Sequence, residues 1–275
     1  MKVSKFQAAG NDFVLINNLK EKIPHHWLPQ LAVKICDRHF SVGADGLILT
    51  ERAEAGADFK MVFLNANGTY AEMCGNGARA LARFAYEEGL AGSAMAFESM
   101  AGLVKAQRLD ENRYRVRLNE ATVHEVNVNV AIDGKEYNGD YIELGDPGVP
   151  HFVLHLPDWE SIPVEELFGL ARKLRFAEAF PKGANVSFFE ILPAGELSAV
   201  TYERGVEDFT LACGTGAGAM ALSVVTQGLT DNHPVVLNLP GGRLEVQISG
   251  KDIFLTGEAR RVFDTVIDLQ TVLRG

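Results

Sequence analysis

The sequence predicts an α/β fold built from two pseudo-symmetric domains. The first observation is a repeated motif. Cys-Gly-x-Gly-Ala begins at Cys74 and again at Cys213, and a Gly-Leu pair follows each copy at the same spacing. The second observation is that each copy opens a helix-like segment closed by a glycine. A strand, a glycine turn and another strand then follow in both halves. The two copies of this unit are separated by about half the chain, which is far longer than the period of a solenoid repeat, so two domains are predicted instead.

In the first half, runs of alternating apolar residues are typical of short strands. They lie near Val3–Phe6, Phe13–Asn17, Leu47–Thr50, Phe59–Leu64 and Tyr114–Leu118. Helical spacing predicts one helix over Trp27–Arg38, shortly after Pro24. It predicts a second helix over Gly77–Glu88, with Gly89 as a C-cap glycine.

The second half follows the same order of elements. Strands are expected over Val186–Leu192 and Ser198–Tyr202, and a loop over Gly205–Thr210. A helix over Gly216–Thr226 is closed by Gly228. The boundary between the two domains is expected near residues 119–124.

Composition and charge exclude several classes of protein. The chain has 275 residues, an ordinary globular composition and a net charge of −10, which argues against nucleic acid and anionic membranes as partners. The longest apolar runs, such as Phe152–Leu156, are too short to span a bilayer, and the N-terminal segment lacks the apolar core of a signal peptide. We therefore expect a cytoplasmic protein. Its three cysteines form no CxxC pair, so neither a disulfide framework nor a metal site is expected.

A cysteine that opens a glycine-rich helix has a specific chemistry. The first N–H groups of a helix have no partner within it and carry the positive end of the macrodipole, so they favour a carboxylate or a phosphate. A thiol at the same place has a lowered pKa and supplies thiolate near neutral pH. Two such thiols that face one carbon can remove a proton from one side and return one to the other. This pattern predicts inversion of a stereocentre by two bases.

Other interpretations of the cysteines remain open. A thiol is often a small buried hydrophobic group, and this is the interpretation that we favour for Cys36. The glycine-rich loops are also candidates for phosphate binding, but neither matches the spacing of the phosphate-binding motifs. A pair of facing thiols can also serve as a redox couple, although the usual redox motif is absent from the sequence.

Eight segments together resemble the diaminopimelate epimerase family. They are Gly10–Phe13, Val42–Leu47, Asn65–Gly68, Ala71–Arg79, Gly183–Val186, Tyr202–Gly205, Leu211–Ala217 and Pro240–Arg243. The resemblance covers nearly the whole chain. It implies an isomerase that interconverts LL- and meso-diaminopimelate without pyridoxal phosphate, in lysine and peptidoglycan precursor synthesis. It also implies two similar domains, each a mixed sheet curled around a central helix, with the site in the cleft between them.

The resemblance further implies domain limits and residue roles. The first domain would span 1–119, with 263–275 returning to it, and the second 120–262. Cys74 and Cys213 would be the two bases, with His151 and Glu203 near the thiols. Backbone N–H groups would hold the reacting carboxylate, and polar side chains would bind the ends of the substrate. The residues assigned to substrate binding are Asn11, Asn65, Gly75, Asn76, Asn185, Arg204, Gly214 and Thr215.

Two departures from the family pattern concern the substrate. Val149 occupies a position where the family usually has asparagine, and Tyr70 stands where an acidic residue is usual. Together with Gly46 they are candidate specificity residues. A racemase of the same fold that acts on histidine, proline or hydroxyproline is therefore an alternative, and a non-catalytic amino-acid-binding or redox protein is a remote one. The expected partner is a small amino acid, no cofactor or metal is expected, and a homodimer is possible.

Overall fold

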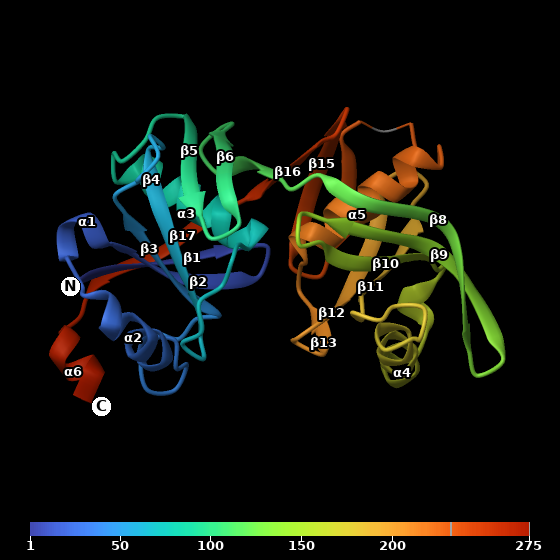
Figure 1. Cartoon of the computed structure of the whole chain (residues 1–275), viewed down its shortest axis with the longest axis horizontal. Coiled ribbons are helices and arrows are strands. Elements are labelled where there is room, and N and C mark those ends of the chain that lie inside the picture. The colour runs from blue at the N-terminus through green and yellow to red at the C-terminus, as the bar shows by residue number, and fades with distance from the viewer. Residues whose placement is uncertain (232, 275) are drawn as a thin grey trace. The chain divides into compact units, whose positions relative to one another are not determined.

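The chain divides into two compact units in the computed structural model, which describes residues 1–231 and 233–274 (Figure 1). Unit 1 comprises Met1–Val116 and Gly257–Gly275, and unit 2 comprises Arg117–Thr256. Both divisions fall a few residues before the domain limits expected at 119 and 262. Strands β7 (Arg113–Leu118) and β16 (Asp252–Glu258) continue through the divisions, so no flexible linker marks them in the sequence.

Unit 1 contains a mixed sheet. Its remaining strands are β1 (Lys2–Ala8), β2 (Asn11–Asn17), β3 (Gly46–Glu51), β4 (Phe59–Asn65), β5 (Ala94–Ser99), β6 (Gly102–Arg108) and β17 (Arg260–Val266). From β17 through β1 and β2 the pairing is antiparallel, and β2 pairs with β3 in parallel. The sheet continues with β3–β4 antiparallel, β4–β5 parallel and β5–β6 antiparallel.

Unit 2 contains a sheet of the same kind. Its remaining strands are β8 (Ala121–Ile132), β9 (Lys135–Leu144), β10 (Val149–His155), β11 (Asn185–Ile191), β12 (Leu197–Glu203), β13 (Asp208–Thr210), β14 (Val235–Leu239) and β15 (Gly242–Ser249). Pairings β8–β9 and β9–β10 are antiparallel, and β10–β11 is parallel. Pairing β11–β12 is antiparallel, β12–β14 is parallel and β14–β15 is antiparallel. The order of parallel and antiparallel pairs is therefore the same in both units.

Each sheet curls around one central helix. Helix α3 (Gly75–Glu87) contacts β1, β2 and β3 as well as β6, and α5 (Gly214–Thr226) contacts β9, β10 and β11 as well as β15. A helix can touch both ends of a sheet only if the sheet wraps around it. The helices are rich in glycine and alanine because they are enclosed, and most of their residues are buried. The predicted fold class is confirmed.

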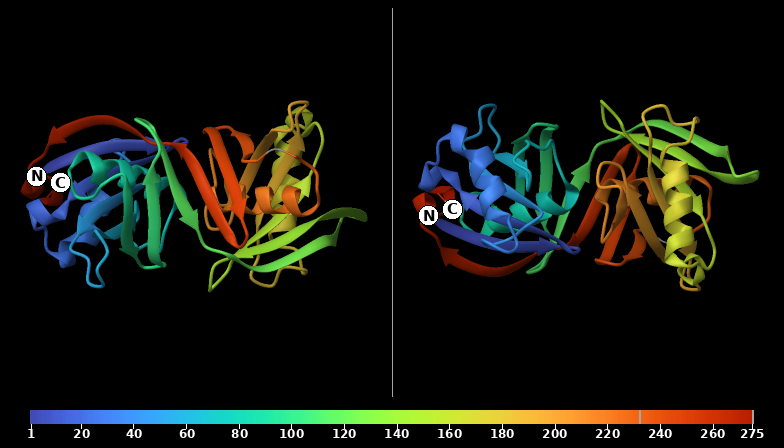
Figure 2. Two further views of the ribbon diagram at one scale, coloured as in Figure 1. Left: turned by 90° about the horizontal axis from the view of Figure 1, so that it is seen from above. Right: turned by 90° about the horizontal axis from the view of Figure 1, so that it is seen from below.

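Shorter helices cover the outer side of each sheet. In unit 1 these are α1 (Asn18–Glu21), a 3₁₀ turn at His25–Trp27, α2 (Leu28–Ile35) and α6 (Leu269–Arg274). In unit 2 they are a 3₁₀ turn at Trp159–Ser161 and α4 (Val164–Arg175), which lies across the outside of its strands in Figure 2. The chain ends meet in unit 1, where the Met1 amino group donates to the Ile267 carbonyl at 2.7 Å.

Several predicted boundaries are corrected by the structure. The predicted loop Gly205–Thr210 ends in a short strand, because Asp208–Thr210 pairs with the end of β12. The helix predicted to reach Arg38 ends at Ile35. Both central helices begin two residues earlier than predicted, so that Cys74 and Cys213 become their N-cap residues. Among the described residues, no helix is long and apolar enough to cross a membrane.

Candidate active site

Cys74 is held at the start of the central helix of unit 1. Its backbone is extended (φ −131°, ψ 127°), and its carbonyl accepts the first helical hydrogen bond from the Ala78 N–H at 2.7 Å. The side chain is half-buried. Gly75 and Asn76 follow as the first helical residues, where N–H groups have no acceptor within the helix. The thiol therefore stands beside donors that favour a negative charge.

Cys213 occupies the same position in unit 2. Its backbone is also extended (φ −110°, ψ 113°), and the sulfur accepts a hydrogen bond from the Gly216 N–H at 3.4 Å. The Thr215 hydroxyl lies 3.5 Å from the sulfur. Gly216 favours this approach, because a Cβ atom there would lie 3.3 Å from the Cys213 sulfur and 2.9 Å from the Thr201 hydroxyl. Helix α5 thus presents its first N–H groups, from Gly214 onward, around a buried thiol.

Glu203 contacts this second thiol. It ends β12, and its carboxylate accepts hydrogen bonds from the Cys213 thiol and, at 3.1 Å, from the Thr210 hydroxyl. Burial raises the pKa of the Glu203 carboxyl, while the two hydrogen bonds act in the opposite direction. Strand β13 supplies Thr210, so the strand that the sequence did not predict is part of the support of the site.

His151 is fully buried on β10. Neither ring nitrogen has a hydrogen-bond partner among the described residues. Burial, and after it the charge of Arg204, lowers the pKa of His151 to about 3. The imidazole is consequently neutral at physiological pH, so it can donate one hydrogen bond and accept another but cannot act as a cation.

Asn185 and Arg204 lie beside this histidine. Asn185 is the parallel partner of His151 across β10 and β11. Its side-chain amide donates to the Pro150 carbonyl at 2.9 Å and accepts from the Arg204 N–H at 2.8 Å. The Arg204 guanidinium donates to the Lys182 carbonyl at 3.1 Å. Asn185 therefore fixes the turn that carries Arg204.

In unit 1, carboxamides connect the Cys74 helix to the β1–β2 turn. The Asn76 side chain donates to the Asn11 side-chain oxygen at 2.5 Å, and Asn11 donates to the Asp45 carboxylate at 3.2 Å. Asp45 is held in turn by Arg38 at 2.8 Å. Asn11 and Asn76 are thus brought together by the fold although they are far apart in sequence.

The other candidate residues of unit 1 lie around the β4 turn. The Asn65 side chain donates to the Thr69 hydroxyl at 3.0 Å, which is turn chemistry. Tyr70 is 43% exposed. Gly46 has a packing role, since a Cβ there would lie 2.6 Å from a ring carbon of Phe63. In unit 2, Val149 begins β10 and is half-buried.

Arg79 has no predicted role from the sequence, although it ends the Ala71–Arg79 motif. Arg79 lies within α3, four residues after Gly75, and its side chain is fully buried. The guanidinium donates to the Gly75 carbonyl at 3.3 Å and to the Asn76 side-chain oxygen at 2.8 Å. No signal in the sequence separates Arg79 from Arg83 of the same helix, and it is the structure that shows Arg79 fully buried and Arg83 half-buried.

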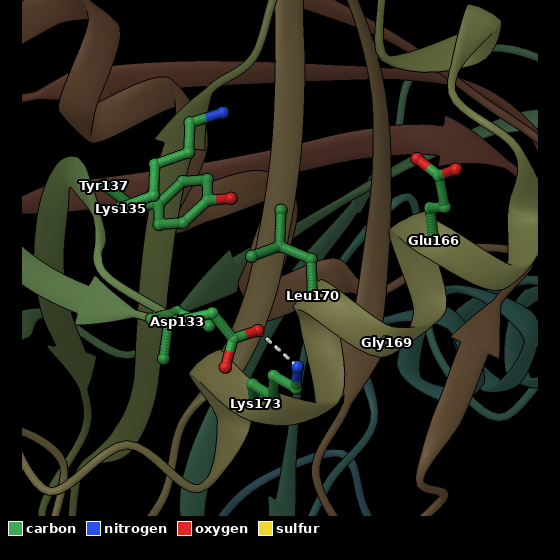
Figure 3. A pocket seen from close by; sticks show the side chains of 8 residues that line it. Asp133, Lys135, Tyr137, Glu166, Gly169, Leu170 and Lys173 are labelled. Atoms are coloured by element: carbon green, nitrogen blue, oxygen red, sulfur yellow. Dashed lines mark hydrogen bonds and ion pairs between the residues drawn. The ribbon is translucent and has the colours of Figure 1, made fainter.

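A hollow of about 450 Å³ lies elsewhere in unit 2, between the β8–β9 hairpin and α4 (Figure 3). An ion pair between Lys173 and Asp133 lies on its wall, and Lys135 stacks over the Tyr137 ring. It is lined by none of the candidate site residues.

Known proteins of one family are similar to this chain over nearly its whole length. The model of the diaminopimelate epimerase family matches residues 3–124 and 145–262. Diaminopimelate epimerase of Aquifex aeolicus (strain VF5) is 41% identical, over 96% of each chain.

The chain belongs to the diaminopimelate epimerase family.

A second member, from Hydrogenobaculum sp. (strain Y04AAS1), is 36% identical over 98% of this chain and 99% of its own. Among solved structures, a probable proline racemase from Agrobacterium radiobacter K84 superposes with a TM-score of 0.71 at 16% identity, covering 98% of this chain and 93% of its own. At that identity the likeness concerns the fold alone. Membership of the diaminopimelate epimerase family confirms the resemblance inferred from the motifs.

Proposed function

We propose that this protein is an isomerase that interconverts LL- and meso-diaminopimelate, with Cys74 and Cys213 as its two bases. The observation that carries the proposal is the same in each unit. A thiol is the N-cap residue of the enclosed central helix, and glycine-rich N–H groups surround it. A helix start of this kind stabilises both a thiolate and a neighbouring carboxylate.

The reaction requires the two cysteines to start in different protonation states. The thiolate takes the proton from Cα, and the electron pair of the broken C–H bond moves toward the carboxylate. The other cysteine, as a thiol, gives its proton to the opposite face of the carbon. One thiolate and one thiol remain, with their roles exchanged, so atoms and charge balance without a further reactant. A turnover in the reverse direction, or exchange with water, restores the first state.

The remaining residues would bind the substrate and stabilise the developing charge. N–H groups of Gly75, Asn76, Gly214 and Thr215 would hold the reacting carboxylate, where charge increases in the transition state. Glu203 would orient the Cys213 thiol, which donates a hydrogen bond to it. A neutral His151 would hold a polar atom of the substrate or a thiol proton. The polar ends of the amino acid would be bound by Asn11, Asn65, Asn185 and Arg204, with Val149, Tyr70 and Gly46 shaping the distal end.

The proposal also includes the partner, the cofactor requirement, the cellular location and the assembly of the enzyme. The partner is a small amino acid, in lysine and peptidoglycan precursor synthesis, and the reaction as written uses no organic cofactor and no metal ion. We place it in the cytoplasm, where free thiols persist. A homodimer is part of the proposal as a possible assembly.

The test is proton NMR in D₂O with reducing agent present. The protein is mixed separately with LL-diaminopimelate, L-histidine and L-proline, and the Cα–H signal is followed. Loss of that signal with diaminopimelate, together with the appearance of the meso isomer, is expected. Loss of the Cα–H signal only with histidine or proline would support the two-base chemistry and refute diaminopimelate as the substrate.

The matched variants Cys74→Ala and Cys213→Ala test the two bases. Each thiol serves one face of the carbon, so each variant is expected to lose inversion completely. Substantial inversion by either variant would overturn the two-base mechanism.

A further inference from the structure

Arg79 is a buried charge whose contacts lie within the first turn of its own helix. All of its side chain is removed from solvent. Two guanidinium nitrogens donate, to the Gly75 carbonyl at 3.3 Å and to the Asn76 side chain at 2.8 Å, while Nε has no hydrogen-bond partner among the described residues. Both acceptors belong to the two residues that follow Cys74.

No carboxylate pairs with Arg79 in the part of the chain that the structure describes. Arginine does not give up its proton in a protein, and an isolated buried cation is costly unless an anion compensates it. Strands β1, β2, β3, β6 and β17 pack against α3. Among the described residues of these elements and of α3 itself, the charge of Cys74 is the one that raises the pKa of Arg79 against the larger, opposite effect of burial.

Unit 2 is built differently at the corresponding place. The residue five positions after Cys213 is Gly218, where a Cβ atom would lie 2.9 Å from a methyl carbon of Leu118, so the packing leaves no room for an arginine. Cys213 has instead an acidic neighbour, the Glu203 carboxylate, to which its thiol donates. A cation favours a thiolate, whereas a carboxylate that accepts the thiol proton favours the thiol.

We propose that Arg79 is a positioning residue that supplies the counter-charge for a Cys74 thiolate and so makes Cys74 the deprotonated member of the pair in the resting enzyme. The inference rests on the proposed role of Cys74. It explains how two cysteines in matching backbone positions acquire the different protonation states that the reaction needs. Through Asn76, the same guanidinium also orients the amide that donates to Asn11.

The test measures the thiolate directly and needs no turnover. The rate of alkylation of Cys74 by iodoacetamide is followed against pH in a Cys213→Ala background, and the modified peptide is quantified by mass spectrometry so that Cys36 is not counted. Arg79→Gln is expected to raise the pKa of Cys74 and to slow its alkylation at pH 7 by about tenfold or more. Arg79→Lys keeps the charge and is expected to restore a large part of the rate.

Two controls separate this effect from misfolding. Arg83→Gln removes another arginine of α3, one that pairs with Glu87 at 2.7 Å, and it should leave the Cys74 profile unchanged. In a Cys74→Ala background, Arg79→Gln should leave the alkylation profile of Cys213 unchanged. A Cys74 profile identical with and without Arg79, in a variant whose circular dichroism matches the parent, would overturn the inference.

The outcome is distinguishable from failure of the proposed function. If Arg79 instead holds the substrate carboxylate, Arg79→Gln raises KM, leaves the alkylation profile unmoved, and refutes the inference while the two-base reaction stands. If the parent protein inverts no amino acid, the proposed function fails, whereas the alkylation result still decides whether Arg79 sustains the thiolate.

Discussion

His151 makes the stability of unit 2 depend on pH. Its imidazole is fully buried and its pKa is lowered to about 3 in the folded protein, against a value of about 6.5 in an unfolded chain. As the pH falls below the unfolded value, the unfolded chain binds a proton that the folded one does not. The stabilising contribution is therefore present above this pH and is lost as the pH falls toward the folded pKa.

The magnitude follows from the two pKa values. Between pH 7 and pH 5 the folded imidazole stays neutral while the unfolded one becomes protonated, which lowers the free energy of unfolding by about 2 kcal/mol. The result is insensitive to the exact folded pKa as long as it stays well below 5. His151→Phe removes the titrating group, so this variant should lose about 2 kcal/mol less than the parent over the same interval.

The assay is urea unfolding at both pH values. Fluorescence of Trp159, which packs against the same apolar cluster as Phe152, reports unit 2 in a Trp27→Phe background. His155→Phe is the matched control on the same strand, because that side chain is exposed. Equal pH dependence of the His151→Phe variant and the parent would refute a neutral, buried His151.

Three further predictions concern the thiols and their support. Glu203→Gln removes the charged acceptor of the Cys213 thiol and should lower kcat by about tenfold to a hundredfold. The acidic limb of the plot of kcat against pH should also change. An unchanged kcat would contradict the orienting role of Glu203. In the proposed reaction the two thiols flank one carbon and could form a disulfide, so a mild oxidant should inactivate the enzyme and dithiothreitol should restore it. Full activity after oxidation would contradict that part of the proposal. Gly216→Ala places a Cβ 2.9 Å from the Thr201 hydroxyl and should lower the free energy of unfolding of unit 2 by about 1–3 kcal/mol. The control Gly169→Ala has open space around the new Cβ and should be neutral or stabilising. Equal unfolding curves for the two variants would refute the close approach at Gly216.

Local signals in the sequence determined the fold class and the positions of the two cysteines. The duplicated Cys-Gly-x-Gly-Ala phrase, with strands of period two around it, was sufficient because these patterns depend on neighbours along the chain. The predicted helix ranges began two residues late, at Gly77 and Gly216, because glycine has a low helix propensity. Burial inside the curled sheet overrides that preference and brings each cysteine to the N-cap position.

Only the tertiary structure decided which polar side chains lose their water. The burial of Arg79 and His151 has no local signal in the sequence, yet both side chains are fully buried. The short strand β13, which holds Thr210 against Glu203, exists because β12 offers a free edge, and three residues carry no periodic pattern of their own. Desolvation depends on segments far apart in the chain, so the charges and pKa values that make the two cysteines unequal could not be inferred from local sequence.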